Sequence, residues 1–85
     1  MPTKMMRVHA VTSSRGLSKS KIYADIKNGL FLPPVAIGPR ARAWAEHEVD
    51  SINRAYLAGK SEAEIRIVVA DLIAARTSVV TKGDL

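Results

Sequence analysis

Proline and glycine interrupt this chain near its middle and separate two regions that have helical periodicity. The pair Pro33-Pro34 cannot continue a helix, because proline has no backbone N–H and its ring clashes with the preceding turn. Val35 to Ile37, then Gly38-Pro39, then Arg40 to Trp44 predict a strand, a tight turn and a second strand. We therefore expect a two-stranded hairpin between helical segments.

Two short helices are predicted before the hairpin. Val8 and Val11 share a face between residues 7 and 14, and Gly16 can end that helix. Ser18 is a suitable N-cap for a second helix over about residues 19–28. Two helices joined by a tight turn form a helix-turn-helix, whose second helix can enter the major groove of DNA. The same spacing also occurs in small helical proteins of other functions.

Two further helices are predicted after the hairpin. The first spans residues 44–57 and has an apolar residue every three or four positions. The second begins at Ser61, which has the capping-box spacing to Glu64, and extends to residue 76. Its apolar stripe comprises Ile65, Val68, Val69, Leu72 and Ile73. Residues 77–85 have no periodicity and are expected to form a flexible tail.

The expected fold class is mainly α. At 85 residues the chain can build one modest core and has no room for a second domain. We therefore expect a single domain over residues 1–76, a small winged helix-turn-helix with a two-stranded hairpin wing and two C-terminal helices.

Positive charge is concentrated in the first half of the sequence. The chain has a net charge of +5, and residues 1–44 contain eight Lys and Arg but only one acid, Asp25. Residues 45–85 contain five basic and seven acidic residues. A solvated surface usually mixes both signs, so this imbalance predicts that the first half meets a polyanion.

The candidate DNA contacts lie on the second helix and the hairpin. Ser20 and Lys21 are expected in the major groove, on the face opposite Ile22 and Ile26, while basic side chains fix the register through phosphates. Tyr23 can pack its ring on the core and turn its hydroxyl to a phosphate. The full candidate set is Ser18, Lys19, Ser20, Lys21, Tyr23, Lys27, Arg40 and Arg42.

The hairpin arginines allow two interpretations. Arg40 and Arg42 have the same parity on a strand, so both can point to one side and reach the DNA backbone, or they can be solvated charges that protect an edge strand. Trp44 shares this parity, yet we interpret it as a core residue, which requires the strand to end or bulge before it.

No arrangement for catalysis or metal binding is found. His9 and His47 have no partner of ligand type at helical spacing, and Glu46, Glu48 and Asp50 are interpreted as helix N-terminal charges rather than as a metal site. The chain has no cysteine and no long apolar run. We expect a cytoplasmic protein that is not an enzyme and uses no cofactor, metal, membrane or small-molecule substrate.

Several of these residues together resemble the AlpA family of prophage regulators. They are Gly16-Leu17-Ser18-Lys19-Ser20-Lys21-Ile22-Tyr23, then Gly29, Phe31 and Pro34, then Gly38-Pro39-Arg40-Ala41-Arg42-Ala43-Trp44, then Glu48-Val49. The resemblance covers about residues 6–52 and departs from the family pattern at Leu32-Pro33 and Arg42-Ala43. It implies a winged-helix DNA-binding protein, akin to excisionases and the DNA-binding end of MerR-type regulators, with its recognition helix at residues 18–28 and its wing at residues 35–44.

The expected partner is double-stranded DNA. Residues 61–76 can also form the contact of a homodimer, because Ile67 lies off the apolar stripe of that accessory helix and would be exposed in a monomer. The alternatives are an excisionase-like directionality factor, a protein-interaction module that uses residues 61–76, and an RNA-binding protein, for which the chain offers few aromatic residues.

Overall fold

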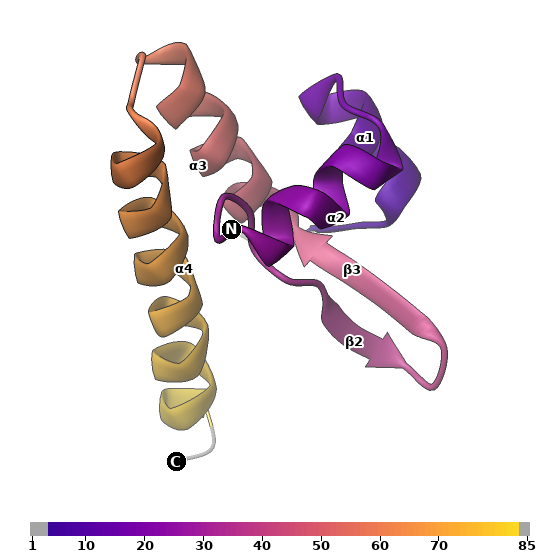
Figure 1. The fold of residues 1–85 in the computed structure, drawn as a ribbon. Coiled ribbons are helices and arrows are strands. Elements are labelled where there is room, and N and C mark those ends of the chain that lie inside the picture. Colours follow the sequence, from indigo (N-terminus) through magenta and orange to yellow (C-terminus); the bar gives the residue numbers. More distant parts are fainter. Residues whose placement is uncertain (1–3, 84–85) are drawn as a thin grey trace.

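A computed structural model describes residues 4–83 of the chain, with side chains as far as Arg76. Its elements are β1 (Met5–Met6), α1 (Val8–Arg15), α2 (Lys19–Lys27), β2 (Val35–Gly38), β3 (Ala41–Ala45), α3 (Glu46–Leu57) and α4 (Glu62–Gly83). Figure 1 shows the β2–β3 hairpin extending away from the helices, with α4 alongside α3. The expected fold class, mainly helical with a hairpin wing, is confirmed. None of the described helices is long and apolar enough to cross a membrane.

The helix ends follow the local signals in the sequence. α1 ends at Gly16, which adopts the left-handed conformation with a φ of 66°. Ser18 is the N-cap of α2, and its hydroxyl accepts a hydrogen bond from the Lys21 backbone N–H at 3.2 Å. Both bonds of the predicted capping box form: Ser61 N–H donates to Glu64 Oε1 at 2.9 Å, and Glu64 N–H donates to the Ser61 hydroxyl at 3.2 Å.

The last helix is longer than we predicted. We expected it to end at residue 76 and a flexible tail to cover residues 77–85, but α4 continues to Gly83. Extending an existing helix needs no new nucleation, so α4 can continue past the last residue of the apolar stripe that predicts it. Residues 84–85 lie outside the described part of the chain.

The sheet has three strands in the order β1-β3-β2, where we predicted two. Met6 of β1 pairs with Trp44, and Val35 of β2 pairs with Ala43, both in antiparallel register. The register shifts at Ile37, between the pairs formed by Ala36 and Gly38. The missed strand β1 has only two residues, too few to show an alternating pattern.

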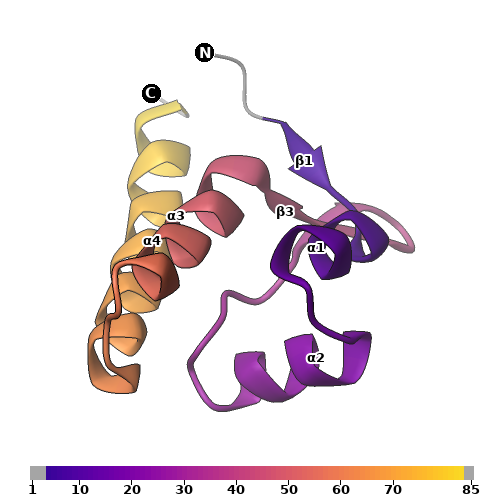
Figure 2. The same ribbon diagram turned by 90° about the horizontal axis from the view of Figure 1, so that it is seen from above.

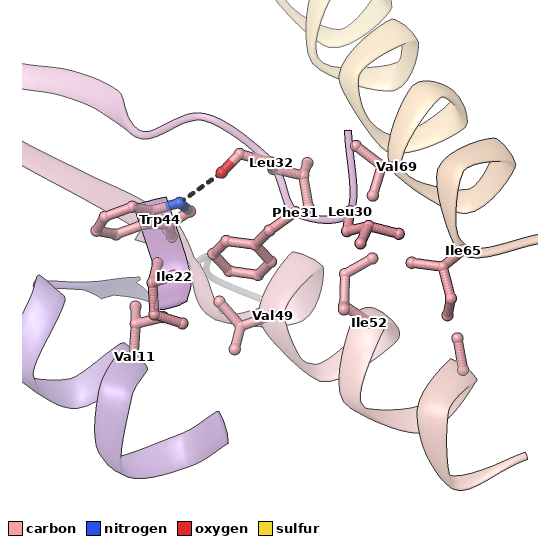
Figure 3. Packing of buried hydrophobic residues seen from close by; sticks show 11 residues of the cluster. Val11, Ile22, Leu30, Phe31, Leu32, Trp44, Val49, Ile52, Ile65 and Val69 are labelled. Carbon is pink, nitrogen blue, oxygen red and sulfur yellow. Dashed lines mark hydrogen bonds between the residues drawn. The ribbon is translucent and has the colours of Figure 1, made fainter. Parts of the chain in front are cut away.

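A single hydrophobic cluster joins all four helices to the sheet (Figure 3). Trp44 is fully buried and its indole N–H donates to the Leu32 carbonyl at 2.8 Å, so its interpretation as a core residue is confirmed. α4 contributes Ile65 and Val69 to the same cluster. The accessory helix is therefore packed on the body that carries α2 and the hairpin.

Candidate nucleic-acid interface

The exposed face of α2 contains no carboxylate. Ser20, Ala24 and Lys27 are exposed and lie together at 100° per residue, while Ile22 and Asp25 are buried on the opposite side. The one acidic residue in the first half of the chain is therefore turned inward. As expected, the outward face is polar and basic.

Lys21 lies on the flank of this face. Its Nζ is 2.9 Å from Asp25 Oδ1, one helical turn further along α2. This short contact and then the negative charge of Asp25 raise the pKa of Lys21 above its usual value. Lys21 also borders a cleft with Tyr56 and Glu62, toward α3 and α4. The structure therefore separates Lys21 from Ser20 and Lys27. The sequence contained a signal for the Lys21–Asp25 pair, because the two residues are four apart on one helix.

A buried ion pair joins the two helices of the helix-turn-helix. The Arg15 side chain is 3% exposed and its Nη1 lies 3.7 Å from Asp25 Oδ2. The Arg15 guanidinium carbon is also 4.5 Å from the centre of the Phe31 ring and 5.4 Å from that of Tyr56. This contact was not predicted from the sequence, and it fixes the end of α1 against α2.

Ser18, Lys19 and Tyr23 lie at the edge of the α2 face. The Ser18 hydroxyl is engaged as the helix cap, whereas Lys19 is exposed. The Tyr23 ring meets the Trp44 ring edge-on, with centroids 6.3 Å apart, and 42% of the residue remains exposed. Tyr23 therefore packs against the root of the hairpin while part of its surface faces solvent, as its sequence position suggested.

Arg40 and Arg42 are both exposed, but they do not share a strand. The hairpin reverses at Pro39-Arg40, one residue later than we predicted, because Gly38 still belongs to β2. Arg40 therefore lies in the turn, and the expected common parity of the two arginines was wrong. Arg42 lies in β3, paired with Ala36.

The parity conflict between Arg42 and Trp44 has a different solution from the one we expected. β3 neither ends nor bulges before Trp44, since the register shift lies in β2. Alternation places both side chains on one face of the hairpin. Tyr23 of α2 covers Trp44 at the root, and Arg42 is two residues nearer the tip, where it is exposed. Arg42 thus lies on the same face of the hairpin as α2.

Ion pairing divides the surface into two parts. From α3 through α4 up to Arg76, each Lys and Arg has an acidic partner: Arg54 pairs with Asp50, Lys60 in the connecting loop pairs with Glu64, Arg66 pairs with Glu62, and Arg76 pairs with Glu48. Between residues 4 and 76 the Lys and Arg residues that form no ion pair are Arg7, Lys19, Lys27, Arg40 and Arg42. Uncompensated positive charge therefore remains on α2, on the hairpin and at the start of α1.

Residues 4–52 match the family described as "Prophage CP4-57 regulatory protein (AlpA)". The chain belongs to the AlpA family. The AlpA match includes the whole helix-turn-helix and hairpin and leaves α4 outside. The chain is also 37% identical over 57 residues to "Uncharacterized protein ORF88" of Enterobacteria phage P4, a match that covers 67% of this chain and 65% of that protein. No solved structure matches the chain.

Proposed function

We propose that this AlpA-family protein binds double-stranded DNA in a sequence-specific manner and thereby regulates prophage transcription. The family description supports a regulatory role. The observation that carries the proposal is the charge division of the surface, because basic residues without acidic partners lie on α2 and the hairpin, the elements a winged helix-turn-helix presents to DNA.

In this proposal α2 is the recognition helix and lies in the major groove. Ser20 and Ala24 are at the centre of its exposed face, where a hydroxyl can bind a base edge and a methyl group can contact thymine. Lys19 and Lys27 bind phosphates on either side of the groove. The wing at residues 35–44 carries Arg40 and Arg42 to the adjacent DNA backbone or minor groove.

Lys21 has a smaller role here than its place in the sequence suggested. Its charge is shared with Asp25, and its flank faces α3 and α4 rather than the centre of the recognition face. Neutralising Lys21 should therefore cost less affinity than neutralising Lys27. The two single Ala variants, measured on one duplex, test this ranking.

The proposal is tested by two double variants that remove the same charge from opposite parts of the surface. Lys27→Gln with Arg42→Gln should weaken duplex binding by about tenfold or more, since each loss removes a charge-assisted hydrogen bond. Arg54→Gln with Lys60→Gln removes two ion-paired positive charges and should change affinity by less than about threefold. Equal losses in the two variants would mean that binding follows net charge alone. A duplex RNA of the same sequence serves as competitor and distinguishes RNA binding.

We further propose that α4 pairs with α4 of a second copy. Its face opposite Ile65 carries four exposed residues at spacings of four, three and four: Ala63, Ile67, Ala70 and Ala74. This spacing is that of a coiled-coil seam, and Ile67 is 61% exposed. In a parallel pair Arg66 of one copy would lie beside Asp71 of the other, five residues along, which gives charge complementarity. Such a dimer would present two recognition helices to one operator.

Sedimentation at micromolar concentration tests the dimer. Ile67→Glu should convert it to a monomer, whereas Leu57→Glu, at an 88% exposed position outside the seam, should leave the sedimentation coefficient unchanged. A wild-type protein that is monomeric and binds a single half-site without cooperativity would contradict the dimer and leave DNA binding untouched.

A further inference from the structure

The segment between α2 and β2, residues 28–34, contacts α4 first where the segment begins, at Asn28. Arg66 Nε donates to the Asn28 carbonyl at 3.0 Å, at the C-terminal end of the recognition helix. The stem of Arg66 passes 3.8 Å from the position that a Cβ on Gly29 would occupy. A positive charge at this end of a helix is favourable, because the free carbonyls carry partial negative charge. Arg66 Nη2 also lies 3.9 Å from Glu62 Oε1 on the same helix.

The same segment contacts α4 a second time near the end of the segment, at Pro33. Arg76 Nη1 donates to the Pro33 carbonyl at 3.0 Å, two residues before β2 begins. Its other nitrogens bind both oxygens of Glu48, with Nε to Oε2 at 2.8 Å and Nη2 to Oε1 at 2.6 Å. Glu48 is 3% exposed, so this bidentate pair holds the Arg76 guanidinium in a fixed position beside the root of the wing.

Between these two contacts the segment is anchored in the core. Leu30, Phe31 and Leu32 are buried, and the Leu32 carbonyl accepts the hydrogen bond from Trp44. Arg66 and Arg76 are ten residues apart, which is about 15 Å along a helix. Figure 2 shows the segment passing beside α4 on its way from α2 to the hairpin. α4 thus holds both ends of the segment that links the recognition helix to the wing along the chain.

We infer that Arg66 and Arg76 are positioning residues for DNA reading, and that α4 sets the placement of the recognition helix relative to the wing. This inference rests on the proposed function. Base contacts are made only when helix and wing both fit one register, whereas phosphate contacts recur along any duplex. A connection that is already ordered removes the cost of ordering it on binding. Loosening it should therefore reduce sequence-specific affinity more than non-specific affinity.

The direct test is Arg66→Met, with Arg54→Met as the matched control. Both arginines are exposed and pair with an acid four residues away, but Arg54 does not contact the connecting segment. Binding is measured to a duplex selected by the wild-type protein from a random-sequence library, and to a scrambled duplex of equal composition. Arg66→Met should lower the ratio of the two affinities by about tenfold, with the salt dependence unchanged. Arg54→Met should leave the ratio within about twofold. Arg66→Lys keeps a cationic donor and should restore most of the ratio.

The double variant Glu48→Gln with Arg76→Gln examines the second contact without leaving a buried charge unpaired. It should lower the same affinity ratio while the protein remains folded, as judged by circular dichroism. If Arg66→Met weakens binding to both duplexes equally and reduces the salt dependence, then Arg66 contacts phosphate itself and the inference is wrong. An unchanged ratio in both Arg66→Met and the double variant also overturns it.

Hydrogen exchange without DNA separates this inference from the proposed function. In Arg66→Met the amides of residues 28–30 should exchange faster than in the wild type, and in the double variant those at the start of β2 should do so. If these amides exchange faster in the variants but the wild-type protein binds no DNA, the proposed function is contradicted, while the role of α4 in ordering the segment is supported. Unchanged exchange together with an unchanged affinity ratio in a protein that does bind DNA would contradict the inference alone.

Discussion

Replacing Asp25 by Asn changes the side-chain volume very little but removes the negative charge that the buried Arg15 and the more exposed Lys21 share. The Arg15 side chain, only 3% exposed, then keeps its positive charge without a carboxylate beside it. Leaving one partner of a buried pair uncompensated costs about 3–5 kcal/mol of unfolding free energy. The rings of Phe31 and Tyr56 still face the Arg15 guanidinium and each retains about 0.5–2 kcal/mol of attraction. We therefore expect a loss near the lower end, about 3 kcal/mol.

Asp50→Asn is the matched control for Asp25→Asn. It makes the same chemical change and the same change in net charge, but the pair of Asp50 with Arg54 has side chains that are 54% and 78% exposed. Such a pair contributes about 0.2–1 kcal/mol. Urea denaturation followed by circular dichroism measures both losses. The double variant Arg15→Met with Asp25→Asn should be more stable than Asp25→Asn alone, because it also removes the buried charge. Equal losses in Asp25→Asn and Asp50→Asn would refute this reasoning.

Three other variants test the packing, the helix cap and the titration of Glu64. Trp44→Phe removes the donor to the buried Leu32 carbonyl and should cost about 1–3 kcal/mol in urea denaturation; a loss below about 0.5 kcal/mol would show that this bond is dispensable. Ser61→Ala removes the capping box of α4 and should cost about 1 kcal/mol in the same assay. Hydrogen bonds from Ser61 lower the pKa of Glu64 from its usual value of 4.5. The wild type should therefore be more stable than Glu64→Gln above pH 4.5, and this difference in unfolding free energy should disappear as the pH falls through the lowered pKa. A difference that stays constant across the usual titration range of a carboxyl group, about pH 3–5, would contradict this.

The helices and the candidate surface were predictable because their signals are local. Ser18, Gly16 and the capping box set helix ends within a few residues, and the proline pair placed the hairpin. The turn was predicted one residue too early, since Gly38-Pro39 and Pro39-Arg40 are both acceptable turn pairs. Charge imbalance along the sequence also indicated which half would carry the unpaired cations.

The contacts that hold the surface in place were not predictable in the same way. Arg76 and Glu48 are 28 residues apart, and Arg66 binds a backbone carbonyl 38 residues away. Neither contact produces periodicity or a motif, because each depends on how separate helices pack. The same holds for Arg15 and Asp25, whose partnership appears only when α1 and α2 are folded together.

The most direct test of DNA binding by the unpaired cations is a salt titration of duplex affinity. Each neutralised phosphate contributes about −0.9 to the slope of the logarithm of the binding constant against the logarithm of salt concentration. Four contacts, from Lys19, Lys27, Arg40 and Arg42, predict a slope of about −3.6 on a selected duplex, and loss of Lys27 and Arg42 should bring it to about −1.8. A slope near zero would contradict DNA binding by these cations. So would a slope that Arg54→Gln with Lys60→Gln reduces as much as Lys27→Gln with Arg42→Gln does.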